Sequence, residues 1–587
     1  MIKMMLATMA LLAMAPTVAL AAGENPQLKH LIEDFESFRR FDDPLQYASE
    51  NPSAPLTLPD VTPAADAQRK TMLDALQKRL GQIDRAKLAA ADQVNHAFLA
   101  RLIADQLESL RFDESRFPFV ADSGFHTTLG YLVGSARIGK RADAEGWLAL
   151  LESVPKYYAD NIANARRGLA TGFIQPKSVV EGVLAVARGQ ASLPVEGDPL
   201  LTPLATLPDT IPLVDQKALR AQALALVAGP VRAAQHEFVR FLEADYLPKA
   251  RTSLGASEMP QGRDYYAWLV RRHTTTDMTP DEVFATGEAE VARIRAEMDG
   301  VIKETGFEGS FAEFLAFLRK DPRFYATTRQ SLLEKVSEIA KRIDDQLPRH
   351  FGTLPRLTYG VRPVPAAIEE NYTSGRYFEG SPQRGIAGGL MINTSHLDQR
   401  PLFEMPALAL HEGVPGHHLQ IALAQELDIP AFRRSADMTA YVEGWALYSE
   451  RLGLEMGIYR DAYERFGRLS FEMWRACRLV IDTGIHWKGW TIEQARACFT
   501  DNTALSERNI ESELQRYIAW PGQALAYKIG EIRIVALRKR AEQTLGEHFD
   551  ERRFHDALLL AGPLPLDLLE SRIDGWIEAE KRAARPG

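Results

Sequence analysis

Cysteine is almost absent from this 587-residue sequence, which contains only Cys477 and Cys498. A disulfide-rich scaffold is therefore excluded. A single disulfide is compatible with an exported protein, and the two positions lie at similar heights if the helices on either side of His486–Gly489 form a hairpin. Two buried free thiols are the alternative, and the sequence alone does not choose between them.

Long apolar runs are also scarce. The one candidate, Met4–Ala15, follows the basic Lys3 and precedes the small-residue pattern Ala19–Ala21, as in a secretory signal peptide cleaved after Ala21. The run is too short to span a bilayer stably; a buried N-terminal helix is the alternative. We therefore expect residues 1–21 to be a signal peptide. The mature protein is then periplasmic or secreted, and no membrane span remains after cleavage.

Positive charge is not in excess. Lysines and arginines number 69 against 78 aspartates and glutamates, for a formal net charge of −9. No basic run is interleaved with aromatic residues, so nucleic acid is not expected as a partner. A hydrophobic fraction of 46% and a charged fraction of 25% are typical of an ordinary globular protein.

Most of the chain is predicted to be helical, because apolar residues recur at spacings of three and four. Two short β-like runs, Leu357–Val361 and Gly389–Thr394, interrupt this pattern. We expect a mainly α-helical protein with a small sheet. Its predicted parts are an N-terminal helical region, 22–350, and a catalytic region, 351–587, whose lobes can interleave. The sheet could offer an open edge to an extended peptide; a structural hairpin is the alternative.

The segment HEGVPGHH, from His411 to His418, places three histidines and a glutamate in an otherwise apolar helix. Burying so many polar groups is costly without compensation. Neutral imidazole is the commonest protein ligand of transition metals, and a glutamate beside the first histidine can act as a general base. We therefore predict a metal site, with one Zn²⁺ as the expected ion and other divalent metals as alternatives. Core histidines with satisfied ring nitrogens are the competing interpretation.

The spacing of these histidines requires a break in the helix. His417 lies six residues after His411, which turns the two side chains about 120° apart on a regular helix. His418 is in phase with His411 but about 10.5 Å further along the axis. Pro415 cannot donate to the carbonyl of His411, and Gly416 tolerates unusual dihedral angles. The Pro-Gly pair therefore predicts a bulge that brings His411 and His417 together, with His418 as the alternative ligand.

A third ligand is expected on a neighbouring helix. Glu443, in AYVEGWALYSE, follows His417 by 26 residues, with Ala440 and Leu447 on its own helical face. Glu450 lies two turns further along the same face. Spacing alone does not show whether Glu443 is the third ligand.

Together, HEGVPGHH, YVEGWALYSE, RACRLVIDTGIH and RYIAWPGQALAYKIG resemble the bacterial domain-of-unknown-function-885 family over about Tyr372–Ile534. The pattern is also similar to that of the helical gluzincin metallopeptidases of the thimet-oligopeptidase and angiotensin-converting types. Those enzymes carry HExxH and, on a later helix, a Val-Glu pair. The resemblance implies a bilobal helical architecture with a deep cleft. It favours Glu443, after Val442, as the third ligand and implies that Glu412 activates water. The residues inserted between Glu412 and His417 depart from that pattern.

The same resemblance implies a tyrosine where the oxyanion develops. Arg516-Tyr517-Ile518 is similar to the Arg-Tyr-Phe run of the angiotensin-converting type, and Tyr527 occupies the sort of position used by tyrosines of the thimet type. We rank Tyr517 first and Tyr527 second as oxyanion donors. Both could instead be helix-packing tyrosines with satisfied hydroxyls. His486 is a candidate donor to substrate, with a structural hydrogen bond as an equal alternative.

We therefore expect an exported zinc metallopeptidase that hydrolyses short or unfolded peptides. Its ligands would be His411, His417 and Glu443, and Glu412 would take a proton from water. Two alternatives stay open. One is a metal-dependent amidase or other hydrolase on the same scaffold, and the other is a catalytically silent protein that captures periplasmic peptides.

Overall fold

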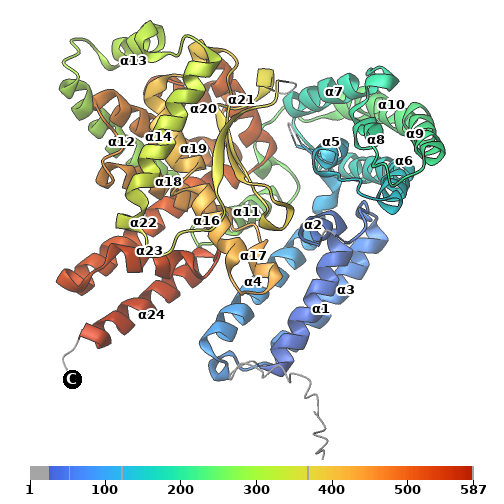
Figure 1. Ribbon diagram of the computed structural model, residues 1–587, viewed down its shortest axis with the longest axis horizontal. Helices are drawn as coiled ribbons and strands as arrows, with labels where there is room; N and C mark the ends of the chain where they lie inside the picture. Colours follow the sequence, from blue (N-terminus) through green and yellow to red (C-terminus); the bar gives the residue numbers. More distant parts are fainter. Residues whose placement is uncertain (1–24, 52, 121–122, 367–368, 585–587) are drawn as a thin grey trace, which may run out of the picture.

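Helices dominate the computed structural model, which describes residues 25–51, 53–120, 123–366 and 369–584 (Figure 1). Within those ranges, most of the β structure forms one three-stranded sheet. The mainly α-helical class with a small sheet, predicted from the spacing of apolar residues, is confirmed. The predicted signal peptide, 1–21, lies outside the described residues.

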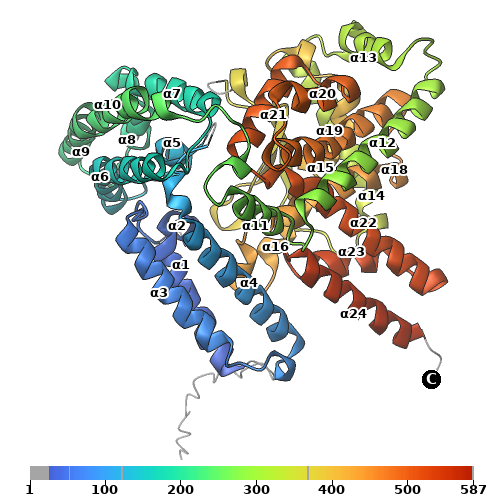
Figure 2. The ribbon, with the colours of Figure 1, turned by 180° about the vertical axis from the view of Figure 1, so that it is seen from behind.

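The first helices form an elongated group at one edge of the molecule, seen from both sides in Figures 1 and 2. A proline at the first helical position and a capping side chain, Asn25 or Thr62, begin two of them. Asn95 ties the group to the rest of the chain, because its side-chain oxygen accepts from Arg433 Nη1 over 2.9 Å. The helices are α1 (Pro26–Asp42), α2 (Pro44–Glu50), α3 (Pro63–Leu80) and α4 (Ala90–Phe112).

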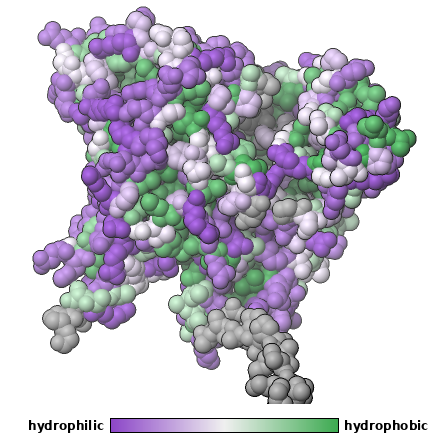
Figure 3. All heavy atoms as spheres, in the orientation of Figure 1, coloured by the Kyte–Doolittle hydropathy of each residue, from purple (hydrophilic) through white to green (hydrophobic). Residues whose placement is uncertain are grey.

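A second group of helices stands apart from the main body in the ribbon and in the space-filling view (Figures 1 and 3). Its members are α5 (Phe125–Ser135), α6 (Arg141–Thr171), α7 (Lys177–Ala191), α8 (Thr202–Ala205), α9 (Leu213–Leu226) and α10 (Arg232–Phe241). The rings of Phe125 and Phe238 lie 4.7 Å apart in its core, and the Trp147 indole donates to the carbonyl of Leu200 over 3.0 Å. These buried aromatic contacts hold the group together as a unit.

The remaining helices build the main body. They are α11 (Gly262–Thr274), α12 (Pro280–Glu304), α13 (Phe311–Lys320), α14 (Arg329–His350), α15 (Met405–Glu412), α16 (His417–Glu426), α17 (Ala431–Arg434), α18 (Thr439–Glu455), α19 (Ala462–His486), α20 (Ile492–Asn502), α21 (Glu507–Ala519), α22 (Ala526–Leu545), α23 (Glu551–Leu559) and α24 (Leu566–Ala584). Helices α12 and α19 pack closely, since a Cβ on Gly287 would lie 2.7 Å from the Cβ of Leu479. The two predicted regions, 22–350 and 351–587, therefore interleave in this body.

The small sheet consists of β1 (Tyr359–Pro363), β2 (Gly375–Phe378) and β3 (Gly388–Ile392) in the order β1-β3-β2. The predicted β-like runs correspond to β1 and β3, which pair in parallel and so do not form a hairpin. The antiparallel partner β2 was not predicted, because it has only four residues and includes Arg376. It forms one edge of the sheet and faces α15.

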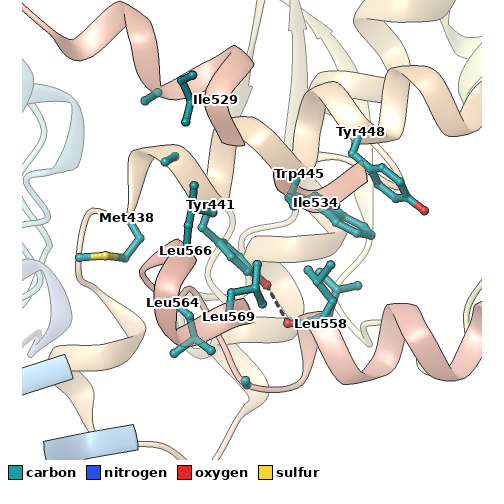
Figure 4. Close-up of a cluster of buried hydrophobic side chains, with 14 of the residues drawn as sticks. Met438, Tyr441, Trp445, Tyr448, Ile529, Ile534, Leu558, Leu564, Leu566 and Leu569 are labelled. Carbon is teal, nitrogen blue, oxygen red and sulfur yellow. Dashed lines mark hydrogen bonds between the residues drawn. The ribbon is translucent and has the colours of Figure 1, made fainter. Parts of the chain in front are cut away.

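Helix α18 is anchored in a dense apolar core, shown in Figure 4. Tyr441, Trp445 and Tyr448 are its largest buried side chains in this core. The hydroxyl of Tyr441 donates to the carbonyl of Leu558 over 3.1 Å, and the Trp445 indole donates to the carbonyl of Pro415 over 2.8 Å. These contacts fix α18 against α23 and against the break between α15 and α16.

Cys477 of α19 and Cys498 of α20 form a disulfide. The bridge joins the two helices that flank the turn at His486–Gly489, so the first of the two alternatives for the cysteines is the one observed. In the described part of the chain, no helix combines the length and the apolar character that crossing a membrane requires.

Candidate metal centre

The histidine-rich segment is broken where the sequence predicted. Helix α15 ends at Glu412 and α16 begins at His417, with Gly413–Gly416 between them. The amide of Gly416 donates to the carbonyl of Leu410 over 3.0 Å. A Cβ at Gly416 would lie 2.0 Å from the carbonyl oxygen of His411, so only glycine fits here. The break is wider than the predicted bulge, because it separates two helices.

Three side chains converge across this break: His411 from α15, His417 from α16 and Glu443 from α18. Glu443 Oε2 lies 3.3 Å from His411 Nε2 and 3.5 Å from His417 Nε2. The three candidate ligand atoms lie within 4.8 Å of one another, and they form the one such group of histidine, cysteine and acidic residues in the described ranges. The structure therefore brings together the ligand set that the sequence proposed.

The geometry of this cluster fits a zinc ion. With ligand bonds of about 2.0–2.1 Å, neighbouring ligand atoms in a tetrahedral zinc site lie about 3.3 Å apart. Glu443 Oε2 is buried and has no hydrogen-bond partner among the described residues. Burying an unpaired carboxylate oxygen is costly unless a cation compensates. Two imidazoles and one glutamate are also a donor set of catalytic zinc sites.

Glu450 holds the ring of His411. Its Oε1 lies 2.8 Å from His411 Nδ1, so Nδ1 carries the proton and Nε2 is left to face Glu443. Glu450 is 2% exposed, and its nearest arginine, Arg475 of α19, lies 3.8 Å away. Burial lowers the pKa of His411, but hydrogen bonds to Glu443 and Glu450 raise it to about 9, so a metal ion that binds Nε2 would have to displace a proton from that nitrogen. Sequence periodicity predicted that Glu450 lies on the same helical face as Glu443. It did not predict that Glu450 holds the ring of His411.

The carboxylate of Glu412 contacts the edge of the sheet. Its Oε2 accepts the backbone N–H of Tyr377 in β2 over 2.7 Å. The carboxylate is therefore fixed beside His411, its neighbour in sequence, without being one of the clustered ligands. This contact also uses an outward amide of β2, so that part of the sheet edge is not open to an added strand. The role of Tyr377 gave no signal in the sequence.

His418 is not directed at the cluster. Its Nε2 lies 3.0 Å from the carbonyl of Leu357, and its Nδ1 lies 3.1 Å from the hydroxyl of Tyr377. The Tyr359 ring is 4.7 Å from the imidazole. Burial lowers the pKa of His418 to about 4, which favours a neutral ring that donates from Nε2 and accepts at Nδ1. His418 is therefore a packing residue beneath the sheet, and His417 is the candidate ligand.

Tyr517 and Tyr527 differ in how their hydroxyls are used. The hydroxyl of Tyr517 donates to the Glu513 carboxylate and accepts from Arg478 Nε over 2.9 Å. Because Tyr517 is fully buried and its proton is engaged, the order in which we ranked the two tyrosines is reversed. The hydroxyl of Tyr527 accepts from Arg516 Nη2 over 3.1 Å, and within the described residues no acceptor takes its proton.

His486 has a structural role. Its Nδ1 accepts the backbone N–H of Ala256 over 2.9 Å, and its Nε2 lies 2.9 Å from the carbonyl of Tyr517. Burial lowers the pKa of the ring to about 3. Both nitrogens are thus occupied by backbone groups, and His486 is not retained as a donor to substrate.

Comparison with known proteins places the chain in a family. Residues 53–573 match the family described as "Bacterial protein of unknown function (DUF885)", and the chain belongs to that family. None of the curated proteins matches it.

Two solved structures are similar. The "putative lipoprotein from Colwellia psychrerythraea" is 26% identical, with a TM-score of 0.87 over 94% of this chain and 99% of that one. The "putative lipoprotein of unknown function from Shewanella oneidensis" is 20% identical, with a TM-score of 0.72 over 93% of this chain and 98% of that one. The second likeness concerns the fold alone.

Proposed function

We propose that this protein is a zinc-dependent peptidase that hydrolyses short or unfolded peptides. The observation that carries the proposal is the convergence of His411, His417 and Glu443, beside a glutamate fixed by a backbone amide. The motif spacing, which is similar to that of helical gluzincins, supports the same reaction class. Two imidazoles and one carboxylate leave a fourth position for water or substrate, which distinguishes a catalytic zinc site from a structural one.

Each residue of the site has a part in the proposed reaction. Zinc held by His411, His417 and Glu443 would supply Lewis acidity toward a carbonyl oxygen and toward water. Glu412, oriented by the Tyr377 amide, takes a proton from the attacking water and delivers it to the leaving amine. The Tyr527 hydroxyl, whose proton has no acceptor in the described part of the protein, donates to the oxygen that becomes negative.

Export of the protein is part of the proposal. A disulfide between Cys477 and Cys498 is typical of oxidising compartments. The similar structure at 26% identity is that of a protein described as a "putative lipoprotein", which favours a position outside the cytoplasm. Peptides that reach such a compartment are the substrates we propose.

The test begins with the purified protein. We expect elemental analysis to find about one zinc per chain. We also expect the protein to hydrolyse a library of N-acetylated pentapeptides, with the products detected by mass spectrometry. A chelator should abolish the hydrolysis and added zinc should restore it. Glu412→Gln should lose hydrolysis but keep the metal, because glutamine can still accept from the Tyr377 amide. Glu426→Gln, a change on α16 outside the cluster, is the matched control.

The outcomes separate the proposal from its alternatives. Hydrolysis of small amides but not of peptides would indicate an amidase. Retention of peptides without turnover, unaffected by Glu412→Gln, would indicate a binding protein. A wild-type protein that takes up no zinc when supplied with it contradicts the proposed function.

A further inference from the structure

Two arginines beside the candidate centre share a single carboxylate. Arg478 of α19 donates to Glu513 Oε2 over 3.0 Å, and Arg516 Nη1 lies 3.7 Å from Glu513 Oε1. Glu513 is the one acidic side chain that forms an ion pair with either arginine in the described ranges. The cluster therefore carries one positive charge more than it carries negative charge. A buried guanidinium is stabilised when an anion balances it.

Arg478 keeps a donor free. The residue is 2% exposed, its Nε donates to the Tyr517 hydroxyl and its Nη2 to Glu513, yet its buried Nη1 has no partner among the described residues. An unmet guanidinium donor in the interior is unfavourable. In the described part of the chain only Nη1 is open, so Arg478 can donate to one oxygen of an anion such as a carboxylate, and the neighbouring guanidinium of Arg516 can meet the other oxygen.

Access to this cluster is from Arg516. Its side chain is 29% exposed, and its Nη2 donates to the side-chain oxygen of Gln523 over 2.7 Å. The ring of Tyr527 lies beneath both guanidinium groups, with its centroid 4.2 Å from Arg478 Cζ and 5.8 Å from Arg516 Cζ. Arg516 thus forms the outer side of the cluster and Arg478 its buried floor.

Two of the helices that carry the cluster, α19 and α22, pack against the helix that carries Glu443 and Glu450. Tyr527 lies one turn before Gly530 on α22, and a Cβ on Gly530 would be 2.8 Å from the Cα of Gly444. Gly444 follows the candidate ligand Glu443 directly. On α19, Arg478 is one turn beyond Arg475, the arginine nearest the carboxylate that holds His411. An anion at the cluster would therefore lie beside a substrate bound at the centre.

We infer that Arg478 and Arg516 form a subsite for a carboxylate of the substrate, in first place the C-terminal carboxylate of a short peptide. The inference rests on the proposed peptidase function and adds a substrate class to it: peptides with a free C-terminus, cleaved within a few residues of that end. The same donors would accept an aspartate or glutamate side chain, and the experiment distinguishes the two sources.

The test compares two forms of one probe. A library of N-acetylated pentapeptides is supplied as free acids and as C-terminal amides, and cleavage by the zinc-loaded protein is followed by mass spectrometry. We expect at least tenfold faster cleavage of the acids. Arg516→Gln should reduce the ratio of acid to amide cleavage toward one, and the ratio is the readout because Arg516 also donates to the Tyr527 hydroxyl and so affects both rates alike. Arg478→Lys, which keeps the charge but removes the free donor, should reduce the ratio in the same direction.

A binding measurement tests the proposed subsite independently of the proposed peptidase activity. The Glu412→Gln protein is incubated with each library, and the retained peptides are identified after ultrafiltration. Preferential retention of acids without cleavage by the wild type would leave the subsite standing and overturn the proposed function. Cleavage with equal rates for acids and amides, unchanged in Arg516→Gln, would overturn the subsite alone. Absence of both retention and cleavage overturns both.

Two further results decide the source of the carboxylate. Enrichment of acidic side chains within the amide library, lost in Arg516→Gln, would assign the subsite to an aspartate or glutamate instead of the C-terminus. The matched control is Arg496→Gln, which changes a partly exposed arginine on α20 that pairs with Glu511 and should leave every ratio unchanged. A similar loss in that control would show that the effect is a general one of surface charge.

Discussion

Glu450 Oε1 lies 2.8 Å from Nδ1 of His411, while Nε2 of the same ring lies 3.3 Å from Glu443. One helix, α18, therefore supplies both a candidate metal ligand and the carboxylate that orients another ligand. The seven-residue spacing of the two glutamates places them on one face of that helix. A carboxylate behind a ligating histidine fixes the ring's tautomer and raises its basicity.

The first prediction concerns this carboxylate. Glu450→Ala is expected to weaken zinc binding about 10–100-fold, because the His411 ring loses the partner that fixes its orientation. Competition with a chromogenic chelator measures the affinity. Glu455→Gln, five residues further on α18 at the surface, is the control. Equal zinc affinity in Glu450→Ala and the wild type would contradict the role given to Glu450.

A second prediction separates the adjacent histidines. His417→Ala should lose zinc binding, since it removes one of three ligands. His418→Gln should bind zinc normally but unfold at a lower temperature, because a glutamine replaces a ring that contacts Leu357 and Tyr377. The test measures zinc content by elemental analysis and the unfolding temperature for both variants. Loss of zinc from the His418 variant with retention by the His417 variant would reverse the assignment.

Local features account for what the sequence predicted correctly. The break between His411 and His417 follows from Pro415 and Gly416, whose effects act within one helical turn. The choice of Glu443 needed the family resemblance, because its partners lie on other helices. The ranking of Tyr517 above Tyr527 was reversed, since the order depends on which hydroxyl meets Glu513 and Arg478 in the folded chain.

The elements and roles that the sequence did not predict also depend on contacts between segments that are far apart in the chain. Strand β2 exists because it pairs with β3 and faces α15, and its four residues have no pattern of their own. The amide of Tyr377 that orients Glu412 is a backbone group, which no residue type reveals. For His486 the sequence left a donor to substrate and a structural hydrogen bond as equal alternatives, and the second is observed, because its two ring nitrogens meet backbone groups from distant segments.

A third prediction concerns pH and Asp482. Burial raises the pKa of this carboxyl to about 7, although hydrogen bonds from the Tyr266 hydroxyl and the Gly522 amide lower it. The unfolded carboxyl titrates near 3.9. The folded protein therefore retains a proton that the unfolded chain releases between about pH 4 and pH 7. The free energy of unfolding should fall as the pH rises through this window.

Asp482→Asn should remove that pH dependence, because asparagine stays neutral and can still accept from Tyr266 and Gly522. Relative to the wild type, the variant should gain stability from pH 5 to pH 8, by about 3 kcal/mol, given 1.36 kcal/mol for each of the roughly two pH units between pH 5 and the pKa of the folded carboxyl. Urea unfolding at several pH values measures this. Asp501→Asn, at an exposed position on α20, is the control. Parallel pH profiles of the wild type and Asp482→Asn would contradict the prediction.

The last prediction distinguishes the two tyrosines, and it rests on the proposed peptidase activity. Tyr527→Phe removes a hydroxyl whose proton is free to meet the oxyanion, so kcat should fall about 10²-fold with little change in KM. Tyr517→Phe removes a hydroxyl that donates to Glu513, which leaves a buried carboxylate less satisfied. That variant should unfold more easily yet keep a kcat within a few-fold of the wild type at low temperature. Peptide hydrolysis and thermal unfolding of both variants measure the split. A large loss of kcat confined to Tyr517→Phe would restore the order inferred from sequence and remove Tyr527 from the proposed mechanism.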